Sequence, residues 1–119
     1  MFIVSDKIDK TILRDLCDAW FGQMVKIVVD IEREIIALGG QLHADAEYLL
    51  IQHGSRQVDV WGANYYPFNA PAKRIEYTAL INIRPHQENP AMEIASGTIK
   101  KRVESIVKKL LLADDEELV

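Results

Sequence analysis

The sequence predicts an α+β fold: one two-layer domain in which a mainly antiparallel sheet of about four strands carries helices on one face. Three observations support this class. Apolar residues recur every three to four positions in three segments, which is typical of amphipathic helices, and they alternate every second position in others, which is typical of strands. These segments follow one another in the order α-ββ-α-ββ-α. The chain has 119 residues, of which 49% are hydrophobic, and a chain of that length can bury a core without disulfides.

A first helix is expected over residues 10–20, with Asp9 or Ser5 as N-cap and Gly22 as the stop. The single cysteine, Cys17, falls within this helical pattern and is expected to be a small buried hydrophobe. The apolar stripe that predicts the helix consists of Ile8, Ile12, Leu13, Leu16 and Trp20.

Residues 24–32 alternate and are rich in β-branched side chains, which predicts a strand. A second apolar run, residues 35–38, ends at Gly39-Gly40 and suggests a hairpin that turns at residues 33–34. A single long helix is the competing interpretation, but β-branched residues and the two-residue period favour strands. The core face of the first strand is expected to carry Val25, Ile27, Val29 and Ile31.

A second helix is expected over residues 44–53, where Gly54 is placed to end it. Residues 57–66 alternate as a third strand in which Gly62 suggests a bulge, and residues 67–74 form a loop marked by two prolines. A fourth strand over residues 75–84 stops at Pro85. The closing helix is the most strongly patterned segment, and the acidic tail, residues 113–119, is expected to be frayed. The apolar stripe of the closing helix consists of Ile99, Val103, Ile106, Val107, Leu110 and Leu111.

Charge and hydropathy exclude several classes of protein. The formal net charge is −4, and binding to nucleic-acid phosphates needs a clustered basic face, so a nucleic-acid partner is not expected. The longest apolar stretches fall far short of the roughly 20 residues that span a bilayer. The first residues lack the charged and apolar regions of a signal peptide. The sequence therefore predicts a cytoplasmic protein with no membrane partner.

One cluster has the composition of a metal or acid/base site: His43, Asp45 and Glu47. Side chains four apart on a helix share a face, and a histidine with nearby carboxylates can ligate a divalent ion. The alternative is that Asp45 and Glu47 complement the positive end of a helix dipole, with His43 preceding the helix. A divalent metal is thus the only cofactor that the sequence suggests.

A second candidate site is the sheet face that points away from the helices. Trp61 and Leu80 would lie there among charged groups, which is the composition of an interface or ligand platform. The simplest partner would be a second copy of the chain, and a small-molecule ligand is the next. The alternative is ordinary cross-strand pairing of charges. The interface or ligand candidates are Asp59, Trp61, Asn64, Asn82 and Arg84.

Four blocks of residues stand out together: Phe21-Gly22 with Met24-Val25-Lys26 and Val28-Val29-Asp30-Ile31-Glu32; Gly39-Gly40 with Leu42-His43-Ala44-Asp45 and Glu47; Gly54-Ser55 with Gln57, Asp59, Trp61-Gly62, Asn64 and Tyr66-Pro67; and Ile81-Asn82-Ile83-Arg84-Pro85. As a set they resemble a family of small bacterial and archaeal proteins catalogued as a conserved domain of unknown function. The resemblance spans most of the chain. It implies family membership and carries no activity with it.

Three hypotheses for function follow. The leading one is a binding or interaction module that self-associates through the open sheet face or an edge strand. The second is a metal-assisted or carboxylate-based hydrolase that uses His43, Asp45 and Glu47 with Asp59 nearby. The third is a regulatory partner of a larger protein or nucleic acid, which the basic last helix suggests, although Glu104 and the acidic tail lie close to that helix. The sequence shows no nucleophile, phosphate-binding or dinucleotide motif, so no catalytic residue is assigned.

Overall fold

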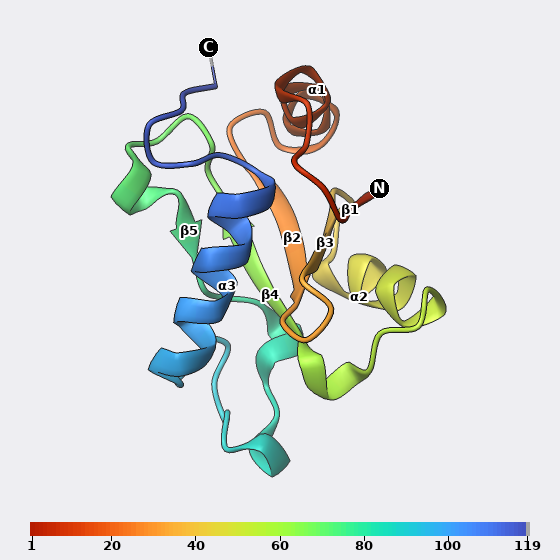
Figure 1. Cartoon of the computed structure of the whole chain (residues 1–119). Coiled ribbons are helices and arrows are strands. Elements are labelled where there is room, and N and C mark those ends of the chain that lie inside the picture. The colour runs from red at the N-terminus through yellow and green to blue at the C-terminus, as the bar shows by residue number, and fades with distance from the viewer. Residues whose placement is uncertain (119) are drawn as a thin grey trace.

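A computed structural model of the chain, which describes residues 1–118, contains an antiparallel sheet with the strand order β1-β3-β2-β4-β5 (Figure 1). The helices lie around this sheet. The strands are β1 (Phe2–Val4), β2 (Val25–Asp30), β3 (Ile35–Leu38), β4 (Val60–Tyr65) and β5 (Ile75–Glu76), and the α-helices are α1 (Lys10–Trp20), α2 (His43–Gln52) and α3 (Gly97–Leu110). The α+β class and the antiparallel sheet are therefore confirmed.

The first helix and the first hairpin form as the sequence predicts. Asp9 caps α1, because its carboxylate accepts a hydrogen bond from the Thr11 N–H at 2.7 Å. In the turn between β2 and β3, the Asp30 carboxylate accepts the N–H groups of Glu32 and Arg33, both at 2.9 Å. This side chain holds the turn closed without the Asn-Gly pair that usually marks such turns.

The larger core lies between one face of the sheet and helices α1 and α3, and in Figure 1 α3 crosses in front of the strands. The alternation of β2 places every second residue on this face, as predicted. Cys17 is fully buried here, which confirms its role as a small core residue. The strand residues on this face include Val25, Ile27, Val29 and Ile31, with Trp61, Ala63 and Tyr65 from β4.

The opposite face of the sheet is also covered, so the prediction that helices lie on one face only is wrong. Helix α2 packs there, and Ala46 and Leu50 bury Val28 of β2 and Val60 of β4. The error has a physical reason. Val28 alternates with the core-facing Ile27 and Val29, which predicts an outward side chain in a two-layer domain, but here both faces of the central strands are buried.

The fourth predicted strand ends after Glu76 instead of continuing to residue 84. Beyond that point the chain crosses β4 at Gly62, where a Cβ would lie only 2.6 Å from the Cβ of Ala79. The Asn82 side chain then takes the place of a backbone partner. Its Oδ1 accepts the Gly62 N–H at 2.8 Å and its Nδ2 donates to the Gly62 carbonyl at 2.9 Å. The strand pattern of residues 75–84 therefore does not reveal that part of this segment contacts β4 through a side chain instead of through backbone pairing.

Both ends of the described chain are held by contacts. Residues 2–4 add the edge strand β1 through antiparallel pairing with β3, a strand too short for its period to be recognised. In the tail, which the sequence predicts to be frayed, Asp114, Asp115 and Glu117 are exposed while other residues make contacts, and residue 119 lies outside the described part. Leu118 is buried, Glu116 pairs with Lys7 and Lys10, and Arg74 donates to the carbonyls of Ala113 and Glu116. Within residues 1–118, no helix is both long enough and apolar enough to cross a bilayer.

Candidate functional site

A cavity of about 270 Å³ lies at the start of α2, on the smaller core's side of the sheet. Its wall is formed by α2, by the ends of β2 and β4, and by the segment that crosses β4. Polar groups occupy the inner part and apolar side chains the rim. The polar residues are Lys26, His43, Asn64 and Thr78, and the larger apolar residues are Leu42, Leu80, Ile81 and Met92.

His43 is the first residue of α2 and is fixed in position within this cavity. Its ring is 8% exposed, and its Nε2 lies 2.8 Å from the Ala63 carbonyl oxygen of β4. Because a carbonyl only accepts, Nε2 carries the proton and Nδ1 is left as an acceptor. Burial lowers the pKa of His43, and the ammonium of Lys26 acts in the same direction, while the Ala63 carbonyl and the Asn64 side chain oppose the shift. The ring is therefore neutral near pH 7.

Lys26 and Asn64 form the floor of the cavity. They are direct cross-strand partners of β2 and β4, so both side chains point to the same face of the sheet. Asn64 is also paired with Glu76 of β5, and its Nδ2 donates to the Glu76 carboxylate at 2.7 Å. This bond fixes the amide, and its Oδ1 is buried without a hydrogen-bond donor among residues 1–118.

A buried ion pair lies one helical turn further along α2. Arg84 is 2% exposed, and its Nη2 lies 3.3 Å from the Glu47 carboxylate. Its guanidinium also lies 4.6 Å from the centroid of the Trp61 ring. Burial raises the pKa of Glu47, and Arg84 opposes that shift. The guanidinium donates to three backbone carbonyls, those of Ile81, Gln57 and Val60, at 2.9, 2.8 and 2.6 Å.

The sheet face that the sequence predicts to be open is covered by α2. Trp61 lies opposite Val29 in the β2–β4 register, so it faces the larger core and is 1% exposed. Asn82 and Arg84 are buried as well, where they hold backbone groups. Asp59 pairs with Arg56 at 3.7 Å, away from the cavity. Of the five interface or ligand candidates, only Asn64 lines the cavity, although Leu80 from the same predicted face is exposed on its rim.

The metal candidates are not brought together. His43 and Glu47 share the inner face of α2, but Asp45 lies on the exposed face in the first turn. No group of three or more His, Cys, Asp or Glu side chains within residues 1–118 is placed to hold a metal ion. Asp45 does stand where it complements the helix dipole. The three-residue metal site therefore receives no support from this arrangement.

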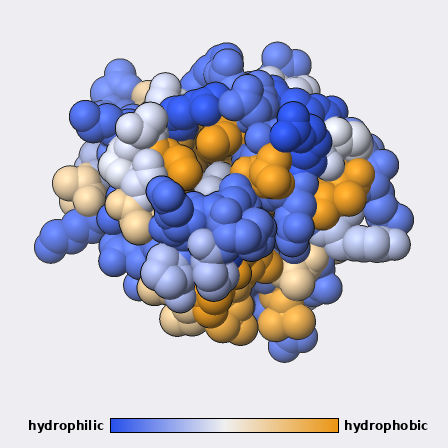
Figure 2. Space-filling view, turned by 90° about the horizontal axis from the view of Figure 1, so that it is seen from below, coloured by the Kyte–Doolittle hydropathy of each residue, from blue (hydrophilic) through white to orange (hydrophobic). Residues whose placement is uncertain are grey.

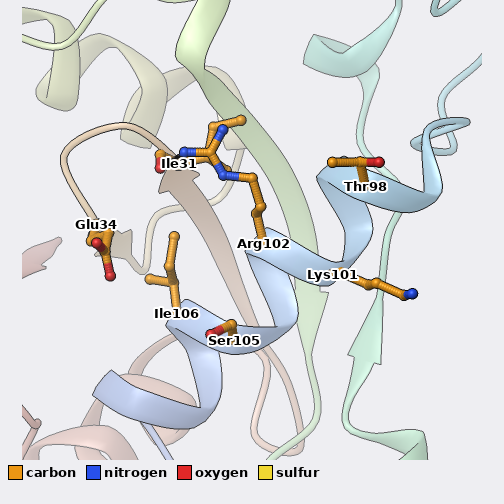
Figure 3. Close-up of a pocket in the computed structure, with 7 residues that line it drawn as sticks. All are labelled: Ile31, Glu34, Thr98, Lys101, Arg102, Ser105 and Ile106. Atoms are coloured by element: carbon orange, nitrogen blue, oxygen red, sulfur yellow. Dashed lines mark hydrogen bonds between the residues drawn. The ribbon is translucent and has the colours of Figure 1, made fainter.

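A second depression lies between α3 and the β2–β3 turn, and Figure 3 shows its lining residues. The Arg102 side chain reaches the Ile31 carbonyl at 2.6 Å and Glu32 at 3.2 Å, while Lys101 points away from the other side chains (Figure 3). Among the described residues, three of the four lysines of α3 have acidic partners, and Lys101 is the exception. Lys100 pairs with Glu93, Lys109 with Glu34, and Lys108 with Glu104 and Asp114. A helix face neutralised in this way does not favour a nucleic-acid partner.

The short 3-10 turns Gln57–Asp59 and Pro85–Gln87 lie at one end of the molecule. The described residues form no continuous apolar face at this end. Figure 2 views the molecule from this end and shows hydrophobic residues in several groups separated by hydrophilic ones. Scattered exposed apolar residues are normal on soluble domains. At the rim of the His43 cavity, by contrast, the exposed side chains of Leu42, Leu80 and Met92 adjoin the buried His43.

The fold and the cavity define a class: an α+β protein with an antiparallel sheet buried on both faces and a polar-floored cavity at the start of its central helix. Residues 2–110 match the family described as "Protein of unknown function (DUF5674)", and the chain belongs to that family. This confirms the family resemblance that the sequence blocks indicated. No curated protein and no solved structure matches the chain.

The sequence indicated His43, Asn64 and Leu80 as candidates, but it assigned them to a metal site or a sheet face and not to one shared cavity. It missed Leu42 and Met92, which are 56% and 42% exposed. The available signal was the pair Leu42-His43 after Gly39-Gly40, an apolar residue at a position where a polar N-cap is usual. Met92 carries no such signal, because its segment has no regular period.

Proposed function

We propose that this protein is a small-ligand binding module whose ligand occupies the cavity at His43. The observation that carries the proposal is the combination of an apolar rim with a few fixed polar groups that converge at depth, which is the usual construction of small-molecule sites. The neutral His43 ring, held by Ala63, adds a group with a shifted pKa inside the cavity, and such groups gather at functional sites.

The proposal is binding without catalysis. The hydrolase alternative needs His43, Asp45, Glu47 and Asp59 to converge, whereas Asp45 is exposed and Asp59 pairs with Arg56. Glu47 is engaged by Arg84 and is not free to act as a base. No arrangement among the described residues favours that alternative over binding.

The binding proposal can be tested by filling the cavity. Ala44 lines it and is exposed, so Ala44→Phe adds a ring to the wall without disturbing either core. Ala19→Phe, at an exposed alanine of α1, is the matched control. Nitrogen-15 NMR titration with hexan-1-ol and phenol should shift the amides of residues 42–44 and 78–81 in the wild type and in Ala19→Phe. Those shifts should disappear in Ala44→Phe. Equal shifts in all three proteins would contradict the proposal.

Self-association is a second candidate, and one observation favours it. Leu80 is 71% exposed and lies beside Leu42 at the cavity rim, and large apolar side chains so exposed are often covered by a partner. A symmetric pair of copies could cover both rims. Sedimentation velocity at increasing concentration should show a dimer that Leu80→Ser weakens. A monomer at all concentrations would remove this candidate and leave the ligand proposal standing.

A further inference from the structure

We infer that the cavity at His43 takes a small organic anion, a carboxylate carried on an apolar chain or ring of roughly six carbons. The inference rests on the proposed function, because it names the class of ligand for the same cavity. Three features of the cavity point to this class: an unpaired ammonium, an uncapped helix start and an apolar rim of limited size.

The unpaired ammonium belongs to Lys26. Its Nζ lies 5.4 Å from the centroid of the Phe21 ring, and it makes no ion pair within residues 1–118. None of the residues that line the cavity is acidic, and the acids on the strand and loop next to it bond to other side chains. Glu76 accepts from Asn64 at 2.7 Å, and Glu93 accepts from Lys100 at 3.1 Å. The cavity therefore carries a positive charge that its own wall does not neutralise, and an anion is the ligand that would.

The start of α2 adds to this preference. Its N-cap is Leu42, whose side chain cannot accept a hydrogen bond, and no side chain caps the first turn. The N–H groups at a helix start carry partial positive charge and favour an anion. Asp45, the acid of the first turn, lies on the exposed face of α2 and does not line the cavity. A helix start alone would not define a site. Here it opens on a cavity that also holds Lys26, so two independent sources of positive potential point to one volume.

The apolar rim excludes a simple inorganic ion as the preferred ligand. Leu42, Leu80 and Met92 are all more than 40% exposed, and covering them removes apolar surface from water. A volume of 270 Å³ holds about nine groups of water size, at roughly 30 Å³ each. A carboxylate with five or six further carbons has about that number of non-hydrogen atoms. A cation is disfavoured by Lys26, because like charges repel.

The decisive experiment compares three ligands of the same chain and different head group: hexanoate, hexan-1-ol and hexylammonium. Dissociation constants come from NMR titration of the full chain at low salt, with amides 42–44 as reporters. Hexanoate should bind about tenfold more tightly than hexan-1-ol, as expected for one charge-assisted contact, and hexylammonium more weakly than both. Lys26→Met should bring hexanoate to within about threefold of hexan-1-ol, because it removes the charge that distinguishes the two head groups. Lys101→Met, at an exposed lysine of α3 outside this cavity, is the matched control.

Each contrary outcome has a distinct meaning. If hexan-1-ol binds as tightly as hexanoate, the anion inference fails and the binding proposal stands. If no probe shifts these amides, both fail. If Lys26→Met keeps the preference for hexanoate, the anion is held elsewhere and the inference is wrong. If acetate or inorganic phosphate binds as tightly as hexanoate, the apolar part of the ligand class is wrong.

Discussion

Removal of the Arg84 guanidinium tests whether this residue is structural, as its contacts indicate, or a ligand group, as its sequence position first suggested. Arg84→Met keeps most of the side-chain volume but deprives one buried and two partly buried carbonyls of a donor and leaves Glu47 without a cation. Each carbonyl left without a donor should lower the free energy of unfolding by about 1 kcal/mol, and the unpaired, half-buried Glu47 carboxylate should lower it by the same amount. The sum, about 4 kcal/mol, agrees with the roughly 3–5 kcal/mol measured when one partner of a buried ion pair is removed.

Two further variants separate the contributions. Arg84→Lys keeps a charge for Glu47 but loses the planar fork that reaches three carbonyls, so it should cost about 2 kcal/mol. Glu47→Gln leaves the guanidinium its carbonyl partners, so it should cost about 1 kcal/mol. Domains of this size are stable by roughly 6–18 kcal/mol, so all three variants should remain folded.

Urea unfolding followed by circular dichroism measures these free energies without relying on Trp61, which touches Arg84. The slopes against urea should be equal in the four proteins, because the surface exposed on unfolding hardly changes. The reasoning is refuted if Arg84→Met costs less than about 1 kcal/mol, or if Glu47→Gln costs as much as Arg84→Met.

Three further predictions concern titration. Burial in the folded state lowers the pKa of His43 below its ordinary 6.5, so the free energy of unfolding should fall as pH drops below about 6.5. Urea unfolding at pH 7.5 and pH 5.5 measures this fall, which should be smaller in His43→Gln. Burial, with a smaller effect of Asp18, raises the pKa of Cys17 to about 11, so a thiol reagent at pH 8 should label it only in urea; rapid labelling of the native protein would contradict this. The Lys7 ammonium and the Ala113 N–H lower the pKa of Glu116 to about 2, so its stabilising effect should be present above about pH 4.5 and lost as pH falls toward 2. Urea unfolding of Glu116→Gln at pH 6 and pH 3 should show a smaller difference than the wild type.

The fold was predictable where a single periodicity determines structure. Helix α1 begins and ends at the predicted residues, and the β2–β3 hairpin forms because β-branched side chains alternate there. What could not be predicted depends on contacts between distant segments. In place of a continued strand, the Asn82 side chain bonds to the backbone of Gly62, twenty residues away. A bond between residues so far apart in the sequence cannot be predicted from a local pattern.

Only part of the candidate site was predictable: the sequence indicated His43, Asn64 and Leu80, but not that they lie in one cavity. Alternation correctly placed Trp61 and Val60 on opposite faces of β4, yet it does not say which face meets which helix. The register of Val29 with Trp61 turns the tryptophan into the larger core. Since both faces of the sheet are covered, the apolar and polar alternation that usually separates core from solvent carries little information here.

The two faces of the sheet are buried to very different extents, and this has a consequence for motion. The face under α1 and α3 belongs to a cluster of 21 buried residues, whereas the face under α2 belongs to one of six. Regions with few buried apolar contacts open locally at a lower free energy than the global transition. Amide hydrogens of α2 should therefore exchange faster than those of β2. The His43 cavity lies at the start of α2, so local opening of this helix would widen the cavity and leave the main core closed.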